Sequence, residues 1–116
     1  SSDVDYIRAM RAQLGEKAHF VLDLKQCRRY GADPLKVADA MGENLVHVHV
    51  SDQDDEHDCL IPGRGTNDFA GLFRHLKAMG FDGAVMLELY RQNFSDPEEL
   101  VEGRRYLEKV LGELSV

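Results

Sequence analysis

The sequence predicts an α/β protein in which parallel strands alternate with helices. Three short apolar segments, at residues 19–24, 45–50 and 84–90, have the length of strands buried in a sheet. Segments with apolar residues at helical spacing precede, separate and follow these strands. Strands and helices that alternate in this way form βα units, and the strands of such units run parallel.

Start and stop signals bound each predicted helix. A glycine follows each of the first three apolar periodic segments and ends the helix there. An Asp-Pro pair, which provides a cap and then a proline suited to the first turn, begins the second helix and the last. In the last predicted helix, the side chain of Glu99 is placed to bond back to the first backbone groups of the helix. The predicted helices span about 3–14, 34–42, 69–80 and 97–114.

The predicted strands are apolar on both faces, which is typical of a parallel sheet covered by helices on both sides. Such a sheet occurs in doubly wound proteins and in closed barrels, and the strand pattern leaves both open. No glycine-rich phosphate-binding fingerprint follows a strand. The Gly-Arg-Gly at 63–65 lies about thirteen residues beyond its strand and lacks the third glycine of that motif.

Composition narrows the class of protein. The chain has 116 residues, one domain or less, with a net charge of −7 and no basic stripe, which argues against a nucleic-acid partner. No stretch approaches the roughly 18 consecutive apolar residues of a membrane span. No leader sequence is visible, and the two cysteines lack metal-binding or redox spacing. We therefore expect a cytoplasmic protein with reduced thiols and no membrane partner.

Three residues that can bind a metal stand near the carboxyl ends of the three strands. They are Asp23, His49 and Glu88. Because strand side chains alternate between faces, and strand ends of a parallel sheet meet at one edge, the three should converge. One imidazole and two carboxylates suit Mn²⁺, Mg²⁺, Co²⁺ or Zn²⁺. The alternative is that the two carboxylates form structural ion pairs and the histidine is a hydrogen-bonded core residue.

The loop after the second strand offers further candidates. It begins with the acidic run 52–58, which is either a solvated charge run or a rim that holds a second ion through Asp55 and His57. Arg64 follows in a turn-prone segment, where it either meets an anionic or hydroxylated substrate or lies on the surface. Asp52, just beyond the strand, is a candidate substrate contact.

Four motifs in order give the chain a resemblance to a known family. They are Val21-Leu22-Asp23, His47 to Asp52, Pro62 to Gly65 with Asp68-Phe69, and Met86-Leu87-Glu88. From about residue 15 to 111 the chain resembles the xylose-isomerase-like barrels, which are sugar phosphate isomerases and epimerases similar in fold to endonuclease IV. The resemblance implies a TIM barrel of eight (β/α) units. Residues 1–116 would then be a single partial domain, the C-terminal half with strands six to eight.

The resemblance also implies a ligand set. In epimerases of this family one divalent ion is held by a Glu, an Asp, a His and a Glu on strands five to eight. Asp23, His49 and Glu88 match the last three, and the strand-five glutamate would precede Ser1. Glu88 resembles one of two glutamates that move a proton, so it would be catalytic as well as a ligand. Gln26 stands where many members have histidine, and it could bond a substrate hydroxyl without shuttling protons.

The implied activity is metal-dependent isomerisation or epimerisation of a sugar or sugar phosphate through an enediolate. A metal-dependent phosphodiesterase resembling endonuclease IV is an alternative, against which stand the net charge and the absence of further metal-binding histidines. A barrel module without catalytic activity is another. Because a partial barrel has free sheet edges, we expect self-association or pairing with the missing N-terminal half, and no activity of this piece alone.

Overall fold

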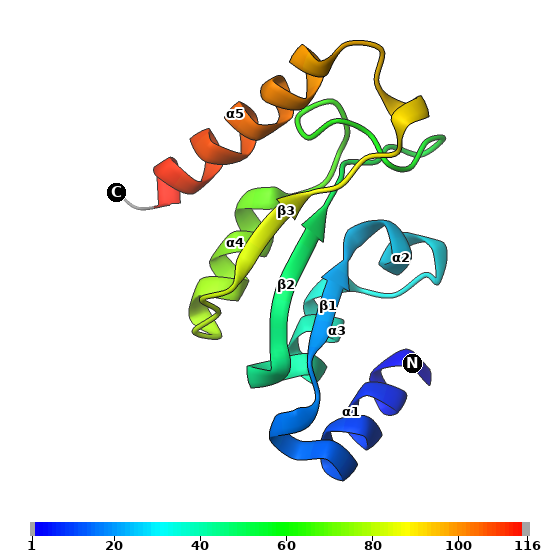
Figure 1. Ribbon diagram of the computed structural model, residues 1–116, viewed down its shortest axis with the longest axis vertical. Helices are drawn as coiled ribbons and strands as arrows, with labels where there is room; N and C mark the ends of the chain where they lie inside the picture. The colour runs from blue at the N-terminus through cyan, green and yellow to red at the C-terminus, as the bar shows by residue number, and fades with distance from the viewer. Residues whose placement is uncertain (1, 115–116) are drawn as a thin grey trace.

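A computed structural model describes residues 2–114 as a three-stranded parallel sheet with helices packed against it (Figure 1). The strand order is β1-β2-β3, and both pairs are parallel, as the sequence predicted. Asp23 pairs in register with His49, and His49 with Met86. The strands are β1 (Phe20–Asp23), β2 (Leu45–Val50) and β3 (Ala84–Leu87).

Five α-helices are described, and four of them lie where the sequence predicts them. The additional helix, α2, follows β1 directly and is too short and too polar to show an apolar period. Asp23 caps it by accepting a hydrogen bond from the backbone N–H of Gln26 at 3.2 Å. The helices are α1 (Ser2–Leu14), α2 (Leu24–Arg29), α3 (Pro34–Met41), α4 (Phe69–Ala78) and α5 (Pro97–Leu114).

The hydrophobic core lies between one face of the sheet and the helices, and α3 and α4 lie behind the sheet in Figure 1. Leu22, Val48 and Val50 on this face are fully buried. On the opposite face, Val21 is 42% and Met86 48% exposed. Among residues 2–114 the helices thus cover one face of the sheet and leave the other uncovered, as expected for three strands of an unclosed barrel. An exposed apolar sheet face is what part of a barrel presents when only some strands are present.

The strand ends differ slightly from the prediction. β3 ends at Leu87 rather than at residue 90, although the backbone N–H of Glu88 still donates to the carbonyl of Val50 at 3.0 Å. Within the described part of the chain, β1 and β3 each pair only with β2, so the predicted free edges are present. None of the described helices combines the length and the hydropathy required to cross a lipid bilayer.

The loop between β2 and α4 is organised around the buried carboxylate of Asp52, which is 2% exposed. Its two oxygens accept hydrogen bonds of 2.9–3.0 Å from the backbone N–H groups of Gln53, Gly63, Gly65 and Asn67. The expectation that Asp52 contacts substrate is therefore corrected, since its oxygens are enclosed and fully engaged. Gly65 is required here, because an added Cβ would overlap the carbonyl oxygen of Gln53.

Arg64, in the same loop, is also placed differently from the expectation. Its guanidinium pairs with Glu102 at 2.7 Å and with Glu99 at 2.8 Å, both on α5. The side chain connects the loop to α5 through these ion pairs, and among residues 2–114 it forms no ion pair with the residues at the carboxyl ends of the strands. Of the two interpretations of Arg64, the structure thus favours a surface arginine with a structural ion pair over a substrate contact.

We expect Asp52→Asn to lower the free energy of unfolding by about 2–4 kcal/mol, because an amide replaces one acceptor oxygen with a donor and leaves buried N–H groups unpaired. Urea unfolding measures the change. Asp82→Asn is the matched control, since Asp82 is exposed, and it should change the free energy by less than about 0.5 kcal/mol. Equal stabilities of the two variants would contradict this account of the loop.

The Arg64 guanidinium holds the pKa of Glu102 below its usual value. A group whose pKa is lowered on folding stabilises the fold above its unfolded pKa and loses that contribution as the pH falls through its folded pKa. We expect Arg64→Met to raise the pKa of Glu102 in an NMR titration. Its melting temperature should be lower than the wild-type value at neutral pH, and the difference should shrink as the pH falls below the usual glutamate range and through the lowered pKa of Glu102.

Arg104→Met is the control for the Arg64 variant. Arg104 pairs with Glu108 on the same helix, at 3.2 Å, and its replacement should leave the titration of Glu102 unchanged. A pKa of Glu102 that is the same with and without Arg64 would refute the assignment of this ion pair.

Candidate metal centre

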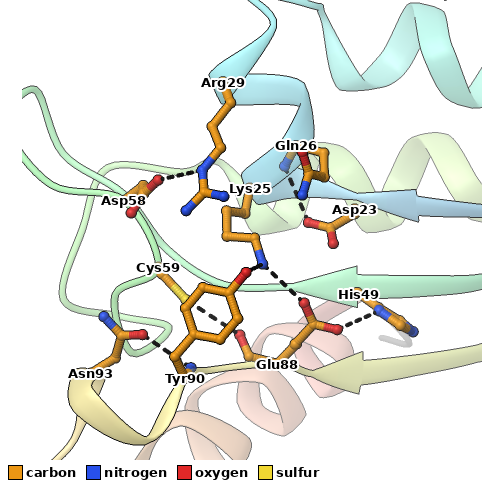
Figure 2. Close-up of polar contacts among 10 residues, drawn as sticks. All are labelled: Asp23, Lys25, Gln26, Arg29, His49, Asp58, Cys59, Glu88, Tyr90 and Asn93. Carbon is orange, nitrogen blue, oxygen red and sulfur yellow. Dashed lines mark hydrogen bonds and ion pairs between the residues drawn. The ribbon is translucent and has the colours of Figure 1, made fainter.

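The three predicted metal-binding side chains meet at the carboxyl edge of the sheet (Figure 2). Asp23 is the last residue of β1, His49 is the last but one of β2, and Glu88 directly follows β3. Their positions place all three on the face that the helices leave uncovered, because Leu22, Val48 and their neighbours fill the other face. The parity argument from the sequence therefore placed the side chains on the correct side.

Each of the three residues offers one ligand atom, and these atoms all lie within 4.8 Å of one another. The closest contact is between Nδ1 of His49 and Oε2 of Glu88, at 2.7 Å. The side chains are partly exposed, 24% for His49 and 37% for Glu88. Among residues 2–114 this is the only group of three or more such side chains close enough to share an ion.

The donor set fits a divalent cation. Ligand atoms at about 2.0–2.2 Å from one small ion lie about 3–4.5 Å from one another, close to the spacing of this group. One oxygen of Asp23 is engaged with the start of α2, which leaves the other free to bind. An imidazole with two carboxylates matches the ligand preferences of Mn²⁺, Co²⁺ and Zn²⁺. The two carboxylates also provide oxygen ligands of the kind that Mg²⁺ prefers. The ligands themselves remain a prediction.

Lys25 and Tyr90 belong to the same site, and the sequence analysis missed them. Lys25 is 4% exposed, and its ammonium group donates to Oε1 of Glu88 at 3.2 Å and to the hydroxyl of Tyr90 at 2.6 Å. The ammonium nitrogen also lies 4.1 Å from the centroid of the tyrosine ring. Their positions in the sequence could have indicated this role, because each residue follows a predicted ligand by two places. Lys25 follows Asp23, and Tyr90 follows Glu88.

The ion pair between Lys25 and Glu88 shifts the pKa values of both partners. Burial acts to lower the pKa of Lys25, but the hydrogen bonds with Tyr90 and Glu88 and the charge of Asp23 outweigh it, and the pKa is raised. Burial acts to raise the pKa of Glu88, but the ammonium of Lys25 and the neighbouring His49 lower it. At neutral pH the lysine is therefore charged and the glutamate ionised.

Gln26 lies beside Asp23, in the first turn of α2, and is partly exposed. Together with Asp23, Val21 and two exposed tyrosines, Tyr6 and Tyr30, it lines a hollow of about 250 Å³ at the free edge of β1. The position is compatible with the predicted contact to a substrate hydroxyl, which stays a prediction.

The predicted second-ion residues do not join the site. Nδ1 of His57 lies 3.1 Å from an oxygen of Asp54 in the exposed acidic loop. The carbonyl oxygens of Asp54 and Asp55 accept hydrogen bonds from Arg28. Neither Asp55 nor His57 is part of a group in residues 2–114 that could hold an ion. The acidic run therefore forms a local turn, and the prediction of a second ion here is not supported.

Similar solved structures share the fold. A D-tagatose 3-epimerase-like protein has a TM-score of 0.70 and 20% identity, covering 87% of this chain and 37% of its own. An IolI protein with a bound zinc atom has a TM-score of 0.56 and 24% identity, covering 84% and 37%. A fusion of a xylose isomerase-like TIM barrel with 4-hydroxyphenylpyruvate dioxygenase has a TM-score of 0.64 and 24% identity, covering 82% and 17%.

Curated relatives are closer in sequence but have no assigned activity. An uncharacterized protein of Mycobacterium tuberculosis is 43% identical over 79 residues, which cover 65% of this chain and 28% of the relative. An uncharacterized protein of Mycobacterium leprae is 40% identical over the same length. The matched region thus spans less than a third of these relatives.

A family profile matches nearly the whole chain. It is described as xylose isomerase-like TIM barrel, and the match covers residues 3–110. The parallel sheet, the order of the βα units and the solved structures of similar fold agree with it. The chain therefore belongs to the xylose isomerase-like TIM barrel family and forms part of such a barrel.

Proposed function

We propose that the complete protein is a divalent-metal-dependent isomerase or epimerase of a sugar or sugar phosphate, and that this chain supplies three of its metal ligands. The observation that carries the proposal is the convergence of Asp23, His49 and Glu88 within 4.8 Å at the carboxyl edge of a parallel sheet. Active sites of TIM barrels are built at this edge. The D-tagatose 3-epimerase-like protein of similar fold supports the reaction class.

The chemistry divides between the ion and the side chains. Asp23, His49 and Glu88 would hold the divalent ion, which would supply Lewis-acid stabilisation of negative charge on a substrate oxygen. Glu88 is the proton carrier of this chain, because it is ionised, partly exposed and at the centre of the group. Gln26 orients a substrate hydroxyl through its amide but cannot exchange protons near neutral pH.

The uncovered face and the free strand edges support a second part of the proposal. An apolar sheet face with Val21 and Met86 exposed is unfavourable in water and needs a cover. We propose that the remaining strands of the barrel provide it, or a second copy of the chain where the N-terminal half is absent, and that the piece alone is inactive. We further propose a cytoplasmic protein that acts on a small molecule without nucleic-acid or membrane partners. The acidic net charge supports the absence of a nucleic-acid partner.

Metal binding by the complete protein tests the site. After dialysis against Mn²⁺, we expect the wild type to retain one ion, and His49→Gln to bind it at least about 10-fold more weakly, because a ligand is lost. The matched control is His75→Gln. His75 also contacts a carboxylate, Asp39, at 2.7 Å, but on the outer helices, and it should not change the affinity. Wild-type protein without a bound ion would disprove the metal site.

The reaction itself is tested with a panel of sugars and sugar phosphates in D₂O. The metal-loaded wild type should interconvert at least one pair and incorporate deuterium at the carbon that loses its proton. Glu88→Gln should lose about 10³-fold or more of this rate, because an amide cannot accept the proton. Cleavage of abasic DNA without turnover of any sugar would instead assign the protein to the phosphodiesterases. Metal binding with neither activity would favour a non-catalytic module.

A further inference from the structure

The two carboxylate oxygens of Glu88 face different partners. Oε2 lies 2.7 Å from the imidazole of His49, on the side of the proposed ion. Oε1 accepts a hydrogen bond from the ammonium of Lys25 at 3.2 Å, on the opposite side in Figure 2. One oxygen of the carboxylate therefore faces the proposed ion, and the other faces the ammonium of Lys25.

Lys25 is held firmly in this position. A buried ammonium is costly to keep unless it is paired, and Lys25 is only 4% exposed. The Tyr90 hydroxyl at 2.6 Å and the face of its ring fix the ammonium from one side, and Glu88 from the other. The helix turn that carries Lys25 is in turn capped by Asp23.

We propose that Lys25 is a positioning residue that restricts Glu88 to binding through one oxygen, and that the site thereby discriminates against Ca²⁺. The inference rests on the proposed function, because it concerns the same ion. Calcium takes six to eight oxygen ligands and commonly uses both oxygens of a carboxylate, whereas Mg²⁺ and Mn²⁺ accept a smaller set with single oxygens. An ion that binds both oxygens of Glu88 must compete with the ammonium of Lys25 for Oε1.

The charge of Lys25 also acts on any cation, but without selectivity. An ammonium near the site repels every divalent ion to a similar extent, so its removal should tighten the binding of all of them. The geometric effect is different, because only ions that favour two-oxygen carboxylate binding gain from the released Oε1. The ratio of the Ca²⁺ and Mn²⁺ dissociation constants cancels the charge effect and reports the geometry of Glu88 alone.

The experiment measures both dissociation constants by calorimetry on the complete protein, with Mn²⁺ and Ca²⁺ titrated separately. We expect Lys25→Met to lower the Ca²⁺-to-Mn²⁺ ratio by about 10-fold or more relative to the wild type, because Ca²⁺ gains a ligand atom. Lys36→Met is the matched control. Lys36 is an exposed lysine of α3, and its loss removes the same charge but should leave the ratio unchanged.

Tyr90→Phe provides an independent test that leaves the lysine in place. It removes the hydroxyl that holds the ammonium but keeps the ring, so the ratio should move in the same direction by a smaller factor. It also decides the inference if Lys25→Met fails to fold by circular dichroism. If the variants change both dissociation constants by the same factor, the inference is overturned and the proposed metal site stands. If the wild type binds neither ion, both are overturned.

Discussion

Asp23 and His49 are partners across β1 and β2, and Glu88 follows two residues after Met86, the partner of His49 on β3. This parallel register sets the spacing of the group, because neighbouring strands lie about 4.8 Å apart and alternate residues share a face. A slip of one residue in either pair would send a ligand into the apolar core among Leu22 and Val48, which are completely buried. The core packing and the site thus select the same register.

The described helices pack against only one face of the sheet and hold the strands in this register from that side. Their contacts bury one face of the sheet, and the chemistry lies on the other. The side chains of the proposed metal site are therefore separated from those that stabilise the fold. Asp52 departs from this separation. It lies just beyond the end of β2, but its carboxylate stabilises the following loop by accepting hydrogen bonds from backbone N–H groups. Its distance in sequence from His49 is small, yet its environment excludes water.

The order of strands and helices and the location of the candidate site could be predicted from the sequence. Strand length, helix caps and the two-residue period gave the βα order and the face on which Asp23, His49 and Glu88 lie. Lys25 and Tyr90 were missed because their role depends on contacts between residues more than sixty positions apart. The roles of Asp52 and Arg64 could not be predicted, because a carboxylate or guanidinium after a strand suits a ligand contact and a structural bond equally well until its neighbours are known.

Asp23 combines two tasks that proteins usually give to separate residues. One oxygen begins α2, and the other is free to face the group with His49 and Glu88. The first turn of α2 carries Lys25, so the aspartate also determines where the counter-charge of Glu88 stands. Replacement of this residue would change the helix start, the ammonium and the ligand set together. Asp23 and Lys25 are consequently constrained together, because the helix start that Asp23 caps also sets the ammonium beside Glu88.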